Sequence, residues 1–321
     1  MDKKLFKQFQ ELAQLWGGYR ASRVILTANN YAVFEQLQTP KTAAEVASAV
    51  GTDQRATEIL LDAVSAFGLL KKTGAKYRNT AIAKKFLLKK SPWYQGDMLR
   101  YADFLWKNWS GLDEVVKSGL PNHSVIRDNE SFIKGMHNNA LLRAKDVVKN
   151  IDLRGVKKAL DLGGGPGTYS MELARQGISV TLFDLPDTIE IARKIVGEAK
   201  VRNINFLRGD YTVDDIGNNY DLVFISQIFH SMSKDQNLAL LEKSRNALNP
   251  NGKIAIQEFL LEKNKNSPLS GALFSVNMLV NTPSGRSYTS QEMKEWLVQS
   301  GFEGVKTKIL NQNVVLTATK K

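Results

Sequence analysis

Residues 157–167 read KKALDLGGGPG, a short apolar segment that runs directly into a glycine-rich loop. The apolar segment has the length and composition of a buried strand. The glycines let the backbone turn tightly and approach a ligand closely, and Asp161 lies near the tip of the strand. In sheets of parallel strands, ligands bind beyond the carboxyl ends of the strands. The stretch therefore predicts the first strand of such a sheet, with a ligand site at its end.

The chain downstream alternates strand-like and helix-like segments. Four more apolar runs follow, VTLFDL, INFLRGD, YDLVFIS and KIAIQEFLL, separated by helix-length segments such as 188–200 and 234–247. A helix over 289–300 with a capping-box pattern comes next, and then two further strand candidates, 305–310 and 314–319. This alternation predicts an α/β domain over residues 151–321. Its sheet is expected to be Rossmann-like, seven-stranded and mostly parallel, with helices on both faces.

The first half of the chain is predicted to be mainly helical. Two helical segments precede Pro40, and the second carries an apolar stripe over residues 24–34. A short helix then begins at Thr42, where Glu45 completes a capping-box pattern, and Gly51 is expected to end it.

A second helix over 53–68 and a hairpin over 69–80 follow. The expected apolar face of this helix consists of Ile59, Leu60, Ala63, Val64 and Phe67. The segment LLKKTGAKYRNT predicts two short strands around a turn at residues 73–74. Helix, helix, hairpin is the order of a winged helix, which we expect over residues 1–105. Residues 106–150 are expected to be linking helices that contribute to a substrate pocket.

The net charge of +12 raises the question of nucleic acid as a partner. Most of the excess, +9, lies in residues 1–150, and residues 71–90 hold eight basic side chains and no acidic one. A winged helix that binds DNA presents a basic second helix. Here that helix carries Asp53, Glu58 and Asp62 against a single Arg55, which would repel phosphates. We therefore expect no nucleic acid partner and interpret the basic cluster as a solvent-exposed surface.

The chain contains no cysteine. Disulfides, thiolate metal sites and cysteine nucleophiles are therefore excluded, and no metal is expected. No apolar segment approaches the roughly 20 residues that a membrane-spanning helix needs. The first residues, MDKKLFKQFQEL, show no apolar signal region. The expectation is a cytoplasmic protein without membrane insertion.

The glycine loop departs from two common nucleotide-binding patterns. The dinucleotide fingerprint G-x-G-x-x-G would need a third glycine where Thr168 or Ser170 stands. The phosphate-binding P-loop would need a Gly-Lys-Ser/Thr sequence, which is missing here. A nicotinamide dehydrogenase and a P-loop nucleotidase are both disfavoured.

Three acidic residues follow three successive predicted strands. Asp161 ends the first strand, and Asp184 comes 23 residues later, about where an acid accepts the hydroxyls of a ribose. Asp210 follows the third strand and could accept from an exocyclic amine, with the ring of Tyr211 beside it. Together the three carboxylates predict a site for a nucleoside that bears an amino-acid cation.

The segments DLGGGPG, FDLP, GDY and FISQIFH, in this order, resemble the class I S-adenosylmethionine-dependent methyltransferases. More specifically, the chain resembles small-molecule O-methyltransferases of the plant caffeate and bacterial hydroxyneurosporene type over nearly its whole length. SFIKGMHNN at 131–139 and NTPSGRSYTSQEM at 281–293 resemble further segments of that family. The resemblance implies S-adenosylmethionine as cofactor, S-adenosylhomocysteine as product, a small-molecule acceptor, and a homodimer formed through the winged-helix domain, with residues 1–34 as the contact.

The resemblance also implies site residues. The methionine moiety is expected near Gly163 and Gly165, the ribose at Asp184, and the adenine at Asp210 and Tyr211. The expected cofactor residues are Asp161, Gly163, Gly165, Asp184, Leu185, Asp210, Tyr211 and Ser226. The expected substrate residues are Phe132, Met136, His137, Phe274, Met278 and Trp109.

His230, just beyond the fourth strand, matches the family's catalytic base, and Glu258 matches the first of two glutamates that assist it. The second glutamate falls at Ser287, and the acid that follows the histidine in the plant enzymes is Ser231. The plant enzymes carry a lysine where this chain has Ser226. Methylation of a phenol-like hydroxyl with His230 as general base is the first hypothesis, because a phenol with a pKa near 10 benefits strongly from a base.

Several alternatives stay open at this point. Methylation of a sulfur, nitrogen or carbon atom is one of them, and a thiol or an activated carbon acid needs general-base help less than a phenol does. His137 is a weaker second candidate for the base, and His123 is expected to be a solvent-exposed loop residue. A function of another class is a winged-helix DNA-binding regulator that senses S-adenosylmethionine.

Overall fold

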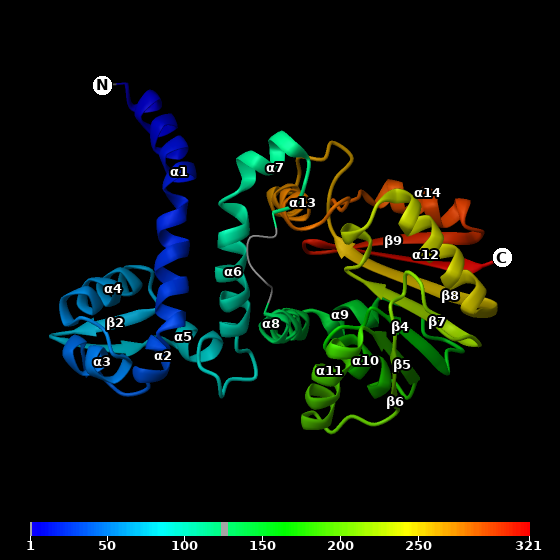
Figure 1. The fold of residues 1–321 in the computed structure, drawn as a ribbon, viewed down its shortest axis with the longest axis horizontal. Helices are drawn as coiled ribbons and strands as arrows, with labels where there is room; N and C mark the ends of the chain where they lie inside the picture. Colours follow the sequence, from blue (N-terminus) through cyan, green and yellow to red (C-terminus); the bar gives the residue numbers. More distant parts are fainter. Residues whose placement is uncertain (1, 123–127) are drawn as a thin grey trace. The chain divides into compact units, whose positions relative to one another are not determined.

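The computed structural model describes residues 2–122 and 128–321, and His123 lies outside them (Figure 1). The chain divides into two compact units, Met1–Asp103 and Phe104–Lys321. Each unit is described by itself below. The predicted linking segment, residues 106–150, stays a prediction.

The first unit is a winged helix preceded by a long helix. Its elements are α1 (Lys3–Asn30), α2 (Val33–Gln36), β1 (Lys41–Thr42), α3 (Ala43–Val50), α4 (Gln54–Ala66), β2 (Leu70–Thr73), β3 (Lys76–Asn79) and α5 (Ala81–Phe86). The three strands form an antiparallel sheet in the order β1-β3-β2. The predicted capping box is present, since Thr42 accepts from the backbone N–H of Glu45 and Glu45 accepts from that of Thr42. Gly51 ends α3 in the left-handed conformation, as predicted.

The prediction of two helical segments at the start of the chain places the break between them at the wrong position. One helix, α1, continues to Asn30, and the break comes only at Ala32, which has a positive φ of 50°. Only the four-residue α2 follows before Pro40. No side chain between Lys3 and Asn30 forces an earlier stop, since Gly17 and Gly18 are tolerated within a long helix.

The predicted apolar face of α4 is also partly wrong. Ile59 and Phe67 are 56% and 45% exposed, whereas Thr57 is buried together with Leu61 and Val64. The Thr57 hydroxyl donates to the carbonyl of Asp53 at 2.7 Å, so its polar group is satisfied within the helix. A pattern of apolar residues alone does not reveal such a buried threonine.

The basic cluster at residues 71–90 is exposed, as predicted. Lys72 pairs with Asp62 at 2.7 Å. Lys71 and Arg78 lie opposite one another on β2 and β3. Like charges in this arrangement repel, which is tolerated where water screens them.

The second unit is a three-layer α/β domain. Its first helices are α7 (Leu112–Ser118), α8 (Asn129–Leu141) and α9 (Ala144–Lys149), and α6 (Gly96–Trp109) crosses from the first unit. The strands are β4 (Lys158–Leu162), β5 (Ser179–Asp184), β6 (Ile204–Arg208), β7 (Tyr220–Ser226), β8 (Leu248–Phe259), β9 (Phe302–Leu310) and β10 (Asn313–Lys320). The intervening helices are α10 (Thr168–Arg175), α11 (Pro186–Glu198), the 3-10 helix η1 (Phe229–Ser231), α12 (Lys234–Ala247), α13 (Leu269–Asn281) and α14 (Ser290–Gln299).

The large sheet has seven strands in the order β6-β5-β4-β7-β8-β10-β9, which confirms the predicted fold. Strands β4 to β8 run parallel, and β10 is antiparallel to both neighbours. One apolar cluster joins the sheet to α12 and α14, and another joins it to α9 and α10 on the opposite face (Figure 1). Alternate residues of β7 serve the two clusters, with Val223 in the first and Phe224 in the second. Among the described residues, no helix combines the length and apolar character needed to span a bilayer.

Candidate functional site

The carboxyl ends of β4, β5 and β6 bring the three predicted acids to one edge of the sheet. These strands are adjacent, and Leu162 pairs with Phe183 while Asp184 pairs with Arg208. Asp161 and Asp184 therefore end neighbouring strands, and Asp210 follows β6 by two residues. The strand order turns three separate sequence signals into one group of carboxylates.

The glycine loop after β4 is held in shape by β5. Gly163 has a φ of +67° and Gly165 a φ of +53°, conformations that favour glycine. The N–H groups of Gly163 and Gly164 donate to the carbonyl of Phe183 at 2.9 and 3.2 Å. A Cβ on Gly163 would lie 2.5 Å from the side chain of Ile228, whereas a Cβ on Gly165 would point into open space. The loop thus packs tightly at its start and leaves room for a ligand beside Gly165.

Asp161 is a buried carboxyl group with one oxygen unused. The residue is 1% exposed, and its Oδ2 accepts from the Ser170 hydroxyl at 2.6 Å. Its Oδ1 has no hydrogen-bond partner among the described residues. Burial, together with the charge of Asp184, raises the pKa of Asp161 to about 7. An unpaired buried oxygen of this kind fits a cationic ligand, which would both donate to it and favour its ionised form.

Asp184 connects the glycine loop to the start of α11. Its Oδ2 accepts from the N–H of Gly165 at 2.8 Å, and its Oδ1 accepts from the N–H of Leu185 at 2.7 Å. The two backbone hydrogen bonds fix the orientation of the carboxylate at this edge of the sheet. Leu185 lies partly exposed beside it.

Asp210 is held by the turn that follows it. Its Oδ1 accepts from the N–H of Thr212 at 2.8 Å and from the hydroxyl of Thr212 at 2.6 Å. These hydrogen bonds lower the pKa of Asp210. Tyr211 lies at the same edge, with its ring 3.6 Å from the position of a Cβ on Gly163. The carboxylate is therefore ionised and fixed, next to an aromatic ring.

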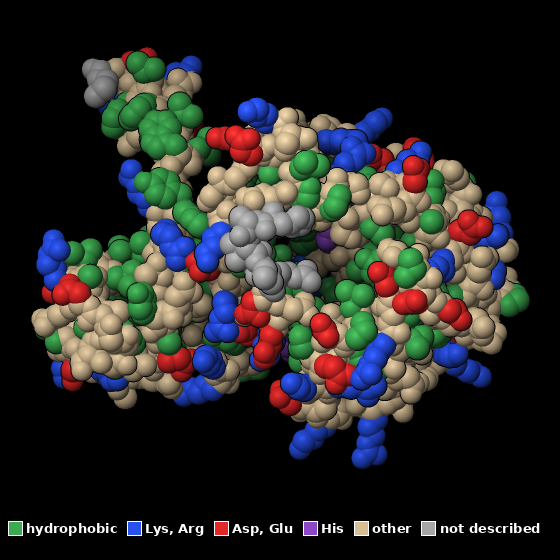
Figure 2. Space-filling view, in the orientation of Figure 1, with side chains coloured by type: hydrophobic (Ala, Val, Ile, Leu, Met, Phe, Trp, Pro, Cys, Tyr) green, Lys and Arg blue, Asp and Glu red, His purple; other side chains and the backbone are tan. Residues whose placement is uncertain are grey.

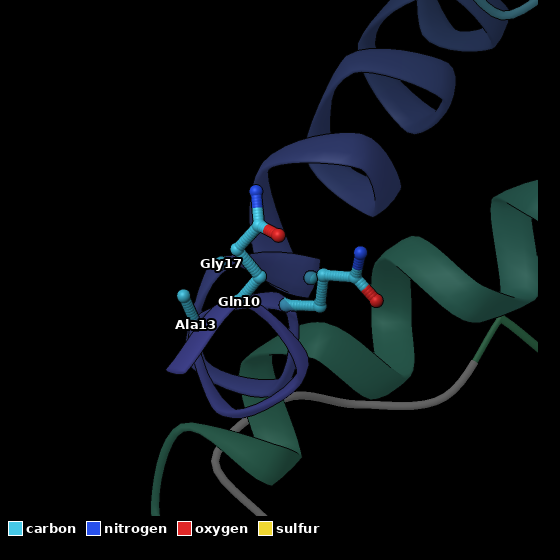
Figure 3. A pocket seen from close by; sticks show the side chains of 5 residues that line it. Gln10, Ala13 and Gly17 are labelled. Carbon is cyan, nitrogen blue, oxygen red and sulfur yellow. The ribbon is translucent and has the colours of Figure 1, made fainter. Parts of the chain in front are cut away.

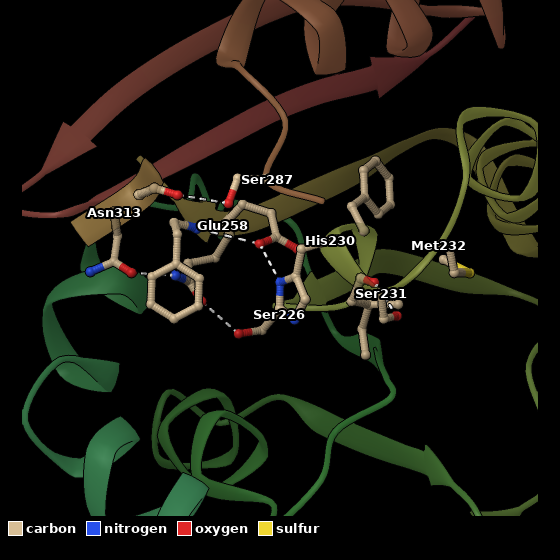
Figure 4. Close-up of polar contacts among 12 residues, drawn as sticks. Ser226, His230, Ser231, Met232, Glu258, Ser287 and Asn313 are labelled. Carbon is tan, nitrogen blue, oxygen red and sulfur yellow. Dashed lines mark hydrogen bonds and ion pairs between the residues drawn. The ribbon is translucent and has the colours of Figure 1, made fainter. Parts of the chain in front are cut away.

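His230 and Glu258 form a hydrogen-bonded pair at the ends of β7 and β8 (Figure 4). The distance from His230 Nδ1 to Glu258 Oε2 is 2.8 Å, and both side chains are largely buried. A carboxylate only accepts, so Nδ1 carries a hydrogen, and in the neutral ring Nε2 then presents its lone pair. The ring of Phe274 meets the imidazole edge-on at 4.8 Å between centroids, and Phe259 packs on Phe274 at 4.0 Å.

The two serines that stand at the family's acidic positions have other partners. Ser231 donates from Oγ to the carbonyl of Ile228 at 2.7 Å, and the buried Ser287 donates to the carbonyl of Gly271 at 3.1 Å. Glu258 is therefore the carboxylate that orients the ring of His230.

Three of the predicted substrate residues lie on helix α13 or contact it. Phe274 and Met278 lie one turn apart on the same face of the helix. Trp109 joins them, because its indole N–H donates to Oδ1 of Asn277 at 2.9 Å. The sequence analysis missed Asn277, although an amide between Phe274 and Met278 on this mainly apolar helix was a usable signal.

Helix α8 carries the other three predicted substrate residues. His137 Nδ1 lies 2.8 Å from the hydroxyl of Thr168, directly after the glycine loop. Met136 is half-buried on the same helix. Phe132 packs against the cluster formed by Ile133, Met171, Ile195 and Val196. The structure thus places His137 at the glycine loop and Phe132 against α10 and α11, while Phe274 contacts His230.

Ser226 ends β7 and donates from Oγ to Oε1 of Gln257 at 2.6 Å. The sequence analysis also missed Gln257, a polar residue inside the apolar run of β8 that is fully buried. Within residues 2–122 and 128–321, no His, Asp and Glu side chains gather in a group of three that could hold a metal ion.

Comparisons with known proteins give a consistent result. Residues 119–303 match the sequence model of an O-methyltransferase domain, and residues 13–89 match that of an O-methyltransferase dimerisation domain. The chain is 32% identical over 311 residues to the 3-hydroxy-5-methyl-1-naphthoate 3-O-methyltransferase of Streptomyces sahachiroi, covering 92% of this chain and 90% of that one. It is 30% identical over 325 residues to the acetylserotonin O-methyltransferase of Gallus gallus, covering 93% of each.

The structure is similar to solved methyltransferase structures over nearly its full length. Human N-acetylserotonin methyltransferase in complex with S-adenosylmethionine superimposes with a TM-score of 0.90 at 26% identity, covering 98% of this chain and 97% of that one. PigF with S-adenosylhomocysteine superimposes with a TM-score of 0.89 at 25% identity, covering 97% and 99%.

Proposed function

Because the chain belongs to the family of S-adenosylmethionine-dependent O-methyltransferases, we propose that it methylates the hydroxyl of a small aromatic acceptor with His230 as general base. Family membership favours this enzyme over the DNA-binding regulator. The contact between His230 Nδ1 and Glu258 Oε2 at 2.8 Å carries the proposal.

The strand-end carboxylates are the proposed cofactor residues. Bound S-adenosylmethionine supplies a methyl group on a positively charged sulfur, which is electrophilic without further activation. The methionine moiety is proposed to lie beside Gly163 and Gly165, where the unpaired Oδ1 of Asp161 suits a cation. Asp184 would accept from the ribose hydroxyls. Asp210 would accept a hydrogen bond from the adenine, and the ring of Tyr211 would pack against it.

His230 is proposed to take the proton of the acceptor hydroxyl on Nε2. Glu258 supports this role in two ways, because it holds the ring in the tautomer with a free Nε2 and stabilises the imidazolium that forms. General-base catalysis of this kind contributes about 10²- to 10⁴-fold to the rate. Burial of the pair excludes water that would compete for the proton.

An aromatic acceptor is proposed from the side chains near His230. Phe274 and Phe259 pack on one side of the imidazole, and Met278 and Trp109 continue the apolar lining along α13. Flat apolar walls favour a flat apolar ligand. The two relatives described above act, by their names, on a hydroxynaphthoate and on acetylserotonin, and both of these acceptors are aromatic.

A homodimer is proposed through α1. Residues 13–89 match a dimerisation domain, and α1 exposes large apolar side chains at alternating spacings of four and three residues. These are Leu5, Phe9, Leu12, Trp16 and Tyr19, each more than half exposed, and Figure 2 shows hydrophobic side chains exposed along this helix at the upper left. Such spacing forms the seam of paired helices.

A hollow on α1 lies beside this apolar seam. It is lined by Gln10, Ala13, Gln14, Gly17 and Gly18 (Figure 3). The small residues would let the backbone of a second helix approach closely, which supports a second copy of the chain as the occupant.

The direct test is a turnover assay with S-adenosylmethionine and a panel of aromatic alcohols, thiols and amines. Methyl transfer to an aromatic hydroxyl, lost in His230→Ala while S-adenosylhomocysteine still binds by calorimetry, supports the proposal. Transfer to thiols or amines alone would refute the hydroxyl acceptor, and full activity of His230→Ala would refute the base.

A further inference from the structure

Four polar side chains form a hydrogen-bonded chain along the large sheet, three of them from its strands. Arg143, between α8 and α9, donates from Nη1 to Oδ1 of Asn313 at 3.1 Å. Gln257 donates from Nε2 to the same oxygen at 2.8 Å, and Ser226 donates from Oγ to Oε1 of Gln257 at 2.6 Å. Figure 4 shows the two ends of the sheet portion, Ser226 and Asn313. The contacts link Arg143 to the tip of β7.

The sheet topology explains why these residues meet. Ser226 pairs directly with Gln257 in the parallel register of β7 and β8. Asn313 begins β10, which is antiparallel to β8 and pairs it with Phe259. The three side chains therefore come from three consecutive strands at nearly the same height of the sheet.

Each hydrogen bond in the chain determines the direction of the next one. A guanidinium group has five donors and no acceptor, so Asn313 must turn its oxygen, not its nitrogen, toward Arg143. That oxygen accepts only, so Gln257 must present its Nε2 to it. The other end of the Gln257 amide, Oε1, then faces Ser226 and accepts its hydrogen.

The series of hydrogen bonds cannot run in the opposite direction, because Arg143 blocks it. If the Gln257 amide rotated by 180°, its oxygen would meet the oxygen of Asn313. If Asn313 rotated as well, its NH₂ would meet the donors of Arg143. Gln257 is fully buried and Asn313 nearly so, and water cannot repair such a mismatch in a buried amide pair.

Ser226 is therefore left as an acceptor. A hydroxyl has one hydrogen, and that of Ser226 is used at Gln257. The hydroxyl of Tyr169 lies beside the same two groups, 3.4 Å from Oε1 of Gln257 and within hydrogen-bonding reach of Ser226. Any ligand that meets Ser226 Oγ finds only lone pairs.

The position of Ser226 indicates which ligand group meets it. Leu162 on β4 pairs with Ile225 on β7, so the next residues, Gly163 and Ser226, follow side by side at the edge of the sheet. This inference rests on the proposed placement of the methionine moiety at Gly163. The α-ammonium group of that moiety has three hydrogens and no lone pair, which makes it a donor only.

We infer that Arg143 is a positioning residue that, through Asn313 and Gln257, holds Ser226 Oγ as an acceptor for the α-ammonium group of S-adenosylmethionine. Arg143 itself contacts neither the cofactor nor the acceptor in this arrangement. Its effect on the site is the polarity of the hydrogen bond that Ser226 makes.

The test compares two ligands by titration calorimetry, S-adenosylhomocysteine and its analogue that lacks only the α-amino group. Arg143→Met should weaken binding of S-adenosylhomocysteine roughly tenfold, the size of one charge-assisted hydrogen bond. It should leave the affinity for the desamino analogue within about twofold of wild type. Equal weakening for both ligands, or weakening for neither, would overturn the inference.

Three further variants distinguish the loss of this series of hydrogen bonds from a general disturbance of the fold. Arg143→Lys keeps a donor toward Asn313 and should restore most of the selectivity for the amino group. In a Ser226→Ala background, Arg143→Met should add no further loss, because the two residues act in series. Arg154→Met, the matched control, removes an exposed guanidinium group that pairs with Asp152, and it should bind both ligands like wild type. A wild-type protein that binds neither ligand would refute the cofactor site itself, which is a different result from the failure of this inference.

Discussion

Oε2 of Glu258 lies 2.8 Å from Nδ1 of His230, and the contact joins the end of β8 to the short helix after β7. Glu258 also accepts the backbone N–H of Phe259 at 3.3 Å, which restrains the carboxylate itself. The ring of Phe274 closes the other side of the imidazole. The histidine is thus held in one tautomer and one orientation before any acceptor arrives.

Replacement of the pair should slow turnover without affecting cofactor binding. We expect His230→Ala to lower kcat by about 10²- to 10⁴-fold, because the acceptor proton then has no base. Glu258→Gln should cause a smaller loss, since the amide oxygen still accepts from Nδ1 but no longer stabilises the imidazolium. Steady-state kinetics and calorimetry with S-adenosylhomocysteine measure the two effects. His137→Ala is the control, and a kcat loss as large as that of His230→Ala would reassign the base.

The acidity of the acceptor should decide how much the base matters. For a series of substituted phenols, the loss caused by His230→Ala should shrink as the pKa of the phenol falls toward the assay pH, because an ionised acceptor needs no base. Rates of wild type and His230→Ala across such a series give this dependence. A loss that stays constant across the series would point to a role of His230 in binding.

Substitution of Gly165 should impair the protein through backbone strain and not through a steric clash. A Cβ at this position meets no atom of the protein, but the φ of +53° strains any other residue by about 1–2 kcal/mol. Gly177 has a φ of +84°, an equally open surrounding, and lies at the opposite end of α10. Both Gly165→Ala and Gly177→Ala should lower Tm, but only Gly165→Ala should weaken S-adenosylhomocysteine binding. Equal affinities of the two variants would place the cofactor elsewhere.

Asp161 should make stability and cofactor affinity depend on pH. Its pKa is raised from an ordinary value of 3.8 to about 7 by burial, so the folded cofactor-free protein keeps this proton where the unfolded chain has lost it. The contribution of Asp161 to stability is therefore full below about pH 4 and falls as the pH rises to about 7. Asp161→Asn, which does not titrate, should lack this component.

Thermal unfolding of wild type and Asp161→Asn between pH 4.5 and pH 7.5 measures the effect as a difference in Tm that changes with pH. A bound cation favours the ionised carboxyl, so cofactor binding at pH 6 should release a proton. Calorimetry in buffers of different ionisation enthalpy detects that release. A Tm difference that is independent of pH would show that Asp161 does not titrate in this range.

The apolar seam of α1 should control the oligomeric state. Trp16→Glu places a charge in the proposed contact, and we expect light scattering to show a monomer where wild type shows a dimer. Ser22→Glu adds the same charge at an exposed position of α1 that belongs neither to the seam nor to the hollow beside it, and it should leave the dimer intact. A monomeric wild type would remove the homodimer from the proposal.

Much of the fold follows from local sequence. Strand and helix segments of the second unit, the capping boxes at Thr42 and Thr289, and the turn between β2 and β3 each depend on residues within a few positions of one another. The acids at the strand ends were predictable for the same reason, because each lies directly after its own strand. The buried face of α4 was not, since the burial of Thr57 depends on what packs against the helix.

The sequence by itself determined which chemical groups stand at the strand ends and which family the chain resembles. Only the tertiary structure decided how those groups are oriented. Trp109 meets Asn277 across 168 residues, and Arg143 meets Asn313 across 170. Such contacts depend on the order and register of strands, to which every part of the chain contributes, and no short segment encodes them. The direction of the hydrogen bond at Ser226 is therefore a property of the folded sheet, although the serine itself is visible in the sequence.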